Sequence, residues 1–113
     1  MQIIKTAPGS QITIGRQGEQ NARQVRFDLN AWLADFDQTG VVELIFQRPG
    51  DSAPFPVETL REGEELVWTI TEVDTANAGT NGKAELRYYL NGALLKSAIS
   101  PVTVDKAMGA PFR

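Results

Sequence analysis

The sequence predicts an all-β protein, an antiparallel β-sandwich of about seven short strands with one or two short helical turns in the connections. Apolar residues alternate with polar ones over several short segments, which is the period of a half-buried strand. Turn residues separate these segments roughly every ten residues. Asn91-Gly92 lies directly between two such segments. This pair strongly indicates a hairpin, because a type I′ turn needs positive φ at both central positions.

The predicted strands share an alternating or nearly continuous apolar pattern. They are Ile3–Ile4, Gln11–Ile14, Val25–Leu29, Val41–Gln47, Leu66–Ile70, Lys83–Leu90, Ala93–Ile99 and, after an interruption at Pro101, Val102–Val104. Pro8-Gly9-Ser10 ends the first strand, and the polar residues 15–23 form a loop before the third. Val41–Gln47 is almost entirely apolar, so we expect a central strand that is largely covered on both faces.

Two connections have helical signals. In residues 30–36, Asn30 is expected to be the N-cap, and Trp32, Leu33 and Phe36 share a face that would cover one end of a sheet. Thr71–Asp74 has the form of a capping box, with Asp in place of the usual Glu or Gln. We expect a single helical turn over residues 75–78 that ends at Gly79, followed by a loop over residues 80–82.

The segment that follows Gln47 is stiff. Pro49 presets φ, and Gly50 accepts the positive φ of a type II turn, so Arg48–Asp51 is predicted to be a tight turn. Pro54 and Pro56 exclude a regular central strand, so residues 53–57 should form an edge strand or an extended loop. The acidic residues 58–65 follow, with Gly63 as a turn residue.

The composition limits the chemistry that the chain can perform. The 113 residues carry a net charge of −3 and include no His and no Cys. Disulfides, thiolate catalysis and cysteine-ligated metals are therefore excluded, and the commonest general base is missing. No basic patch suggests nucleic acid, no apolar run is long enough to span a membrane, and no signal peptide is visible. We expect no enzyme, no metal site and no cofactor.

Carboxylates and aromatic side chains leave two alternatives to weigh. Glu62, Glu64 and Glu65 cluster near one turn, and Asp35 and Asp37 near another. A pair of carboxylates can act as acid and base in a glycosidase, but no aromatic sugar platform adjoins these residues in the sequence. We therefore interpret both clusters as solvated loops.

Among the aromatic residues, Trp68 and Tyr88 lie on the apolar faces of their strands and should pack in the core, with the Tyr88 hydroxyl bonded to backbone as in a tyrosine corner. Tyr89 points the other way, beside Arg87, and is the better candidate for an exposed contact. Phe55 lies between two prolines. It is either a preorganised contact residue or a plug over the edge of the sandwich.

A family resemblance rests on several segments spread over residues 11–105. They are Arg16–Glu19 before Val25–Leu29, Val41–Phe46 running into Q-R-P-G-D-S-A-P at Gln47–Pro54, Val67–Thr71 with Asp74–Ala76, Glu85–Tyr89, and Lys96-Ser97 before Val102–Val104. With these segments the chain resembles the small Ig-like domain of the baseplate upper protein N-terminal type, found in baseplate and tail-fibre proteins of tailed phages and prophages. The Q-R-P-G-D-S-A-P run is the most specific of them.

The resemblance implies one Ig-like β-sandwich domain over residues 1–113, with a core at about 11–105 and a tail at 106–113. It implies a non-enzymatic structural protein of the phage tail or baseplate, located in the virion and made in the bacterial cytoplasm. Its expected partners are other tail or baseplate proteins and copies of itself, as a trimer or hexamer. We expect the interface at sheet edges and at Arg48, Asp51, Pro54, Phe55, Pro56, Arg87 and Tyr89. The alternative is a carbohydrate-binding module for host adhesion, which would use Tyr89, Trp32 or Phe55.

Overall fold

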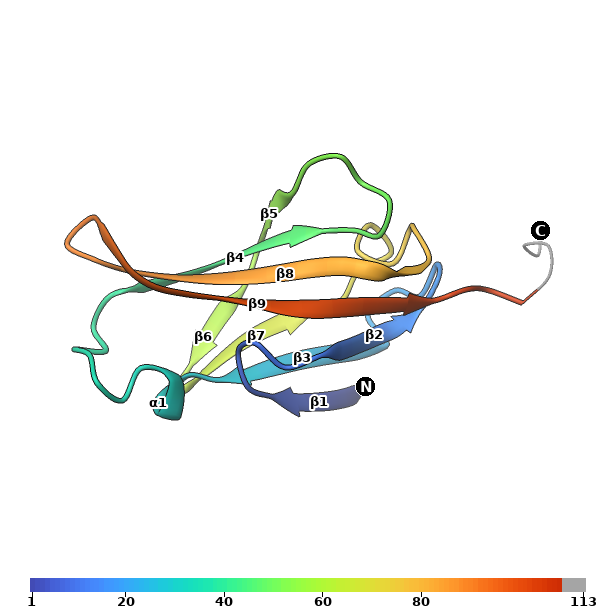
Figure 1. The fold of residues 1–113 in the computed structure, drawn as a ribbon. Helices are drawn as coiled ribbons and strands as arrows, with labels where there is room; N and C mark the ends of the chain where they lie inside the picture. Colours follow the sequence, from blue (N-terminus) through green and yellow to red (C-terminus); the bar gives the residue numbers. More distant parts are fainter. Residues whose placement is uncertain (109–113) are drawn as a thin grey trace.

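Nine strands and one short helix follow one another along residues 1–108, the part of the chain that this computed structural model describes (Figure 1). In chain order the elements are β1 (Gln2–Thr6), β2 (Ile12–Arg16), β3 (Arg23–Asp28), α1 (Leu29–Trp32), β4 (Val41–Gln47), β5 (Phe55–Val57), β6 (Leu60–Glu62), β7 (Glu65–Thr69), β8 (Gly79–Leu90) and β9 (Ala93–Asp105). A tail was expected at residues 106–113. Its last five residues, 109–113, lie outside the described residues.

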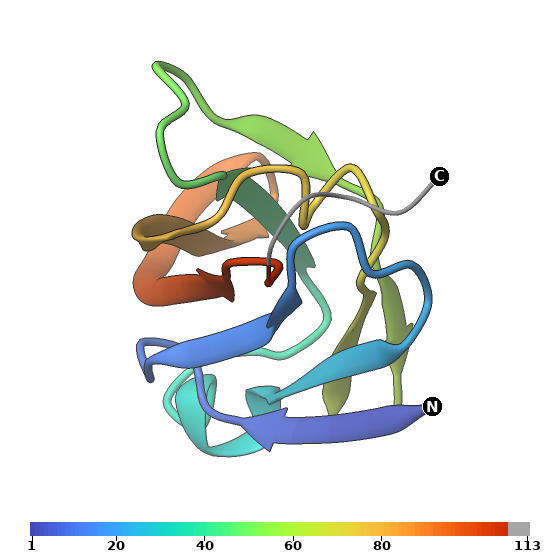
Figure 2. The same cartoon turned by 90° about the vertical axis from the view of Figure 1, so that its right-hand side faces the viewer.

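The strands form two sheets that face each other across the core (Figure 2). The four-stranded sheet has the order β1-β3-β7-β6, and the five-stranded sheet has the order β2-β9-β8-β4-β5. One of the two is curled like half a barrel. Short connections pass from sheet to sheet at both sides, from β1 to β2 and from β5 to β6.

Both sheets are mixed, which corrects the expectation of a purely antiparallel sandwich. β1 pairs with β3 and β2 pairs with β9 in parallel, whereas all the other described pairs are antiparallel. The cause lies in two reversals of direction. The chain turns at residues 7–10, where Gly9 has a φ of +93°, and turns again at residues 17–22. Because β2 runs between these turns in the other sheet, β1 and β3 point the same way (Figure 1).

The core follows the predicted alternation. The largest fully buried side chains are Trp68, Tyr88, Phe27 and Phe46, each with no measurable exposure. Phe46 of one sheet meets Trp68 of the other edge-on, with ring centroids 5.0 Å apart. Burial of each such side chain contributes roughly 1.5–3 kcal/mol of hydrophobic free energy, and edge-to-face aromatic pairs add about 1 kcal/mol.

The predicted bounds of β4 are confirmed, but the expectation that both its faces are covered is wrong. Leu44 and Phe46 are buried, whereas Val41 is 63% exposed and Glu43 is also exposed. β4 lies between β8 and β5 inside a sheet, yet its outer face is only partly covered, at Ile45 and Gln47 beside Pro54. The apolar run therefore marks an exposed apolar surface as well as a core strand.

The first helix is shorter than expected, and its cap is a different residue. Asp28, not Asn30, is the N-cap, and its carboxylate accepts a hydrogen bond of 2.9 Å from the amide of Asn30. Helical geometry begins at Leu29, whose amide donates to the carbonyl of Glu64 at the β6–β7 turn. Leu33 is buried, and Trp32 and Phe36 pack partly buried against the core, as expected.

The Thr71–Asp74 capping box forms without a helix behind it. The amide of Thr71 donates to the Asp74 carboxylate at 2.9 Å, and the amide of Asp74 faces the Thr71 hydroxyl at 3.4 Å. Residues 72–75 are only a turn, and β8 already begins at Gly79 instead of Lys83. The loop expected over residues 80–82 is thus part of a strand.

The Asn-Gly hairpin is confirmed. Asn91 and Gly92 have φ values of +52° and +80°, and Leu90 pairs with Ala93 across the turn. The predicted break at Pro101 is wrong, because β9 continues through it to Asp105. Pairing with β2 starts only at Val102, so the missing amide of Pro101 costs no bond to β2.

Candidate functional site

The Arg48–Asp51 turn has the predicted form. Gly50 has a φ of +84°, and the amide of Asp51 donates to the carbonyl of Arg48 at 3.0 Å. Pro49 is buried against two glycines of β8: a Cβ on Gly79 would lie 2.7 Å from the Pro49 ring, and one on Gly82 would lie 3.1 Å from it. Sequence reasoning missed this contact, since the spacing of the two glycines alone did not indicate a partner.

Arg48 and Asp51 are engaged within the chain. The Arg48 Nε donates to the Asp51 carboxylate at 2.8 Å, and Asn77 donates to the same carboxylate at 3.0 Å. The Arg48 guanidinium also reaches the carbonyl of Val73 at 3.2 Å. The hydrogen bond from Arg48 lowers the pKa of Asp51. These two predicted interface residues therefore attach the turn to the segment before β8.

Phe55 packs as a plug against the core. Its ring lies edge-on to Phe46 with centroids 5.9 Å apart, and the Arg48 guanidinium stands 5.4 Å from the ring centre. Pro54 and Pro56 on either side are exposed. The loop thus presents its prolines to solvent and directs its aromatic ring inward.

The second group of predicted residues, Arg87 and Tyr89, lies on the outer face of the five-stranded sheet. On β4, β8 and β9 this face consists of four cross-strand rows, which we call the outer face: Val41–Tyr89–Leu94, Glu43–Arg87–Ser97, Ile45–Glu85–Ile99 and Gln47–Lys83–Pro101. Alternation places these residues opposite the buried Ala84, Leu86 and Tyr88.

The outer face combines exposed apolar side chains with balanced charge. Val41 is 63% exposed, Leu94 52% and Ile99 53%. Arg87 bonds Glu85 on its own strand at 2.9 Å, and this hydrogen bond raises the pKa of Arg87. With Glu43 and Lys83, the four rows hold two acidic and two basic residues, so their formal charge is zero.

Two shallow hollows flank the outer face. One lies around Tyr89, lined also by Thr39, Glu43 and Asn91. The other is lined by Ile45, Gln47, Pro54, Lys83, Glu85 and Ile99, so it joins the loop to the sheet face. The structure therefore brings Pro54, Arg87 and Tyr89 onto one surface, whereas it directs Arg48, Asp51 and Phe55 toward the body of the protein.

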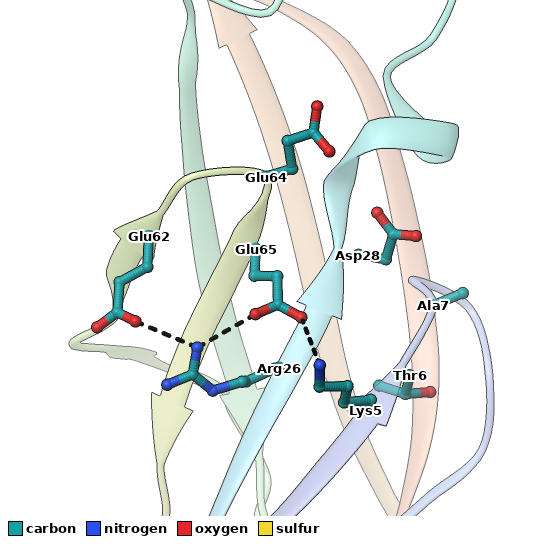
Figure 3. A pocket seen from close by; sticks show the side chains of 8 residues that line it. All are labelled: Lys5, Thr6, Ala7, Arg26, Asp28, Glu62, Glu64 and Glu65. Carbon is teal, nitrogen blue, oxygen red and sulfur yellow. Dashed lines mark hydrogen bonds and ion pairs between the residues drawn. The ribbon is translucent and has the colours of Figure 1, made fainter.

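The four-stranded sheet has a hollow of opposite character (Figure 3). Arg26 lies between Glu62 and Glu65, 3.1 Å from each, and Lys5 is 4.0 Å from Glu65. The bond to Glu65 is the main cause of a raised pKa for Arg26. Asp28 and Glu64 complete the lining, so four acidic and two basic residues give a charge of −2. Of the expected cluster at Glu62, Glu64 and Glu65, Glu62 and Glu65 thus belong to an open ion-pair network, and Glu64 lines the hollow beside it.

The loop before β4 is held by a buried hydroxyl. The Tyr88 hydroxyl donates to the carbonyl of Asp37 and accepts a hydrogen bond of 3.0 Å from the amide of Gly40. A backbone bond was expected for this residue, but its partners lie far back in the chain, unlike those of a tyrosine corner. Elsewhere, Lys96 covers Trp32: its Nζ lies 5.6 Å from the ring centre and donates to the Trp32 carbonyl at 2.6 Å.

Neither a comparison with models of known protein families nor a search of curated proteins finds a match for this chain. Within residues 1–108, acidic side chains nowhere gather in a group suited to hold a metal ion. In the same residues, no helix has the length and apolar character needed to cross a membrane.

Proposed function

We propose that this protein is a non-enzymatic structural module that forms protein–protein interfaces in the tail or baseplate of a phage. The observation that carries the proposal is the outer face, where the exposed Val41 of β4 and Leu94 of β9 lie in one row with the half-exposed Tyr89 of β8. Exposed apolar patches of this kind are typical of protein interaction sites. Arg87 and Tyr89 are its charged and aromatic members, and Pro54 of the loop borders it.

An Ig-like classification is part of the proposal. The order β1-β3-β7-β6 and β9-β8-β4-β5 corresponds to the sheets ABED and GFCC′ of an Ig sandwich, with β2 as an additional edge strand beside β9. The parallel pairing of β1 with β3 is a departure from the usual antiparallel sheet. The phage part of the proposal rests on the sequence resemblance, above all on the run Gln47–Pro54, whose turn packs firmly on β8.

Protein composition of purified particles tests the proposal. Tailed particles from a strain that encodes the chain should contain it in a fixed ratio to the other tail or baseplate proteins. Light scattering over a range of concentrations would then report self-association. The sequence resemblance leads us to expect a trimer or a hexamer. Absence of the chain from purified particles would refute the virion assignment.

The hollow beside Tyr89 favours a second candidate, a carbohydrate-binding module for host adhesion. A half-exposed tyrosine ring adjoins Thr39, Glu43 and Asn91 there, and such polar groups can bond sugar hydroxyls while the ring stacks on the sugar. Trp32 and Phe55 are engaged with Lys96 and Phe46 instead. Glycan binding that is lost on Tyr89→Ala and kept on Phe55→Ala would support this candidate.

A further inference from the structure

We propose that two copies of this chain associate face to face through the outer face, related by a two-fold axis that runs across the strands. The inference deepens the proposed assembly function and rests on it, because it names the partner that this surface takes. The partner that binds this face is a second copy of the chain, because the charges of the outer face are complementary to those of the same face in a second copy.

The two broad faces of the protein differ in formal charge, which affects how readily each would contact the same face of a second copy. The outer face has a formal charge of zero, whereas the residues that line the hollow on the four-stranded sheet sum to −2. The whole chain has a net charge of −3. Like charges that face each other across an interface oppose association. Net charge therefore opposes self-association on the hollowed face and does not oppose it on the outer face.

The register of the rows determines which two-fold axis fits. The second row centres on Arg87 and the third on Glu85. An axis parallel to the strands and directly over β8 would place Arg87 opposite the Arg87 of the second copy. An axis across the strands, midway between these rows, places each Arg87 opposite the other copy's Glu85. Together with the bond of 2.9 Å within each chain, this yields a ring of four alternating charges.

The same axis brings the first row opposite the more polar fourth row, with Val41 opposite Gln47. Leu94 of the first row comes opposite Pro101 of the fourth, and Tyr89 comes opposite Lys83, whose amine can lie on the ring. Such a contact is isologous, as expected for a two-fold interface. It would be one of the contacts of a hexamer built from three dimers, and it is not the contact of a cyclic trimer.

The size of the face predicts a weak dimer. Its four rows of three hold twelve residues, fewer than the roughly 20–30 residues per side of a standard interface. The contact would gain area from the loop through Pro54. We therefore expect a dissociation constant on the order of micromolar, with dimer and monomer in exchange.

Charge reversal within one chain tests the proposal. Arg87→Glu and Glu85→Arg, made singly, each place like charges opposite one another in the dimer, whereas the double variant restores the ring. Sedimentation velocity or light scattering over the micromolar range should show a dimer for the wild type and the double variant. Each single variant should bind at least tenfold more weakly. Glu58→Arg is a matched control, since this exposed residue lies outside the outer face, and it should dimerise like the wild type.

Circular dichroism of each variant is the control for folding. Leu94→Lys provides an independent disruption should a single charge variant not fold, because Leu94 is exposed and leaves the pair of Glu85 and Arg87 intact. A wild type that stays monomeric up to millimolar concentration overturns the dimer, as does a Leu94→Lys variant that dimerises fully. A monomeric wild type that nevertheless occurs in purified tailed particles overturns only the dimer and leaves the assembly function standing.

Discussion

The ring of Pro49 occupies the space that a side chain at Gly79 would need. A Cβ on Gly79 would lie 2.7 Å from the Cβ of Pro49, and Gly79 has a φ of +151°. The rigid turn after β4 is thereby held against the first residue of β8, a position far along the chain. The most specific run of the sequence, at Gln47–Pro54, thus has a structural role that requires a glycine elsewhere.

Gly79→Ala should destabilise the protein by about 3 kcal/mol, because overpacking and backbone strain act together. Gly9→Ala is a matched control, since Gly9 has a φ of +93° with nothing within 4 Å of a Cβ. It should cost only the strain, about 1–2 kcal/mol. Urea unfolding of the two variants gives the comparison. Equal losses of free energy of unfolding would show that Pro49 yields easily and does not clamp the turn.

Tyr88→Phe should lower the free energy of unfolding by about 1–2 kcal/mol without changing the fold. The hydroxyl accepts a hydrogen bond from the amide of Gly40 and donates one to the carbonyl of Asp37. Phenylalanine lacks the hydroxyl, so both backbone groups lose this partner. Chemical denaturation provides the measurement. Tyr89→Phe, on the opposite face of the same strand, should stay within about 0.5 kcal/mol of the wild type; a loss as large as that of Tyr88→Phe would contradict the assignment.

Asp74→Ala should be among the most destabilising single changes, at about 2–4 kcal/mol. The buried carboxylate accepts hydrogen bonds from the indole of Trp68 at 3.2 Å and from the amide and hydroxyl of Thr71 at 2.9 and 3.1 Å. Asp74→Asn keeps one acceptor oxygen and should lose less. Thermal unfolding of the two variants checks the order, and an alanine variant as stable as the asparagine variant would refute it.

The Arg48–Asp51 pair should add to stability at neutral pH and be lost in acid. The bond from Arg48 lowers the pKa of Asp51 in the folded state, so the folded protein binds this proton less readily than the unfolded chain. The contribution is therefore present above the ordinary carboxyl pKa, about 3.9, and is lost as the pH falls through the lower folded value. Asp51→Asn should flatten the decline of unfolding free energy below about pH 4. An unchanged decline would contradict this.

Substitutions at Pro54 and Phe55 should have different effects, the first on self-association and the second on stability. Pro54 is exposed beside the outer face, so Pro54→Ser should leave stability nearly unchanged and weaken self-association. Phe55 packs on Phe46, so Phe55→Ala should lower the free energy of unfolding by about 2 kcal/mol, less than for a fully buried ring. Thermal unfolding and light scattering on both variants distinguish the roles. A destabilised Pro54→Ser variant would assign this proline to the fold.

Local signals predicted much of this structure. The turns at Gly50 and Asn91-Gly92 need particular backbone angles, so two adjacent residues sufficed to identify each. The core faces of β7 and β8 followed from alternation. The features that depend on distant contacts were not predicted. These are the parallel pairing of β1 with β3, the parallel pairing of β2 with β9, and the start of β8 at Gly79, where Pro49 packs.

The candidate site was predicted only in part for the same reason. Alternation correctly placed Arg87 and Tyr89 away from the core. It could not show that Val41 and Leu94 lie beside Tyr89, because that depends on the register of three strands. Arg48 and Asp51 look like free charges in the sequence. Asp51 is bonded by Asn77, 26 residues away, and Arg48 by the carbonyl of Val73, in a segment that only the fold brings near.

The pairing of β2 with β9 sets an order in time for the synthesis of this protein. Ile12 is paired with Val102, so β2 has no strand partner until almost all described residues have been made. At about 5–20 residues per second, the ninety residues from position 13 to Val102 take several seconds to appear. During this interval Ile12 and Ile14, both fully covered in the finished fold, are open to solvent or to a chaperone. The second strand of this chain must wait for its last one.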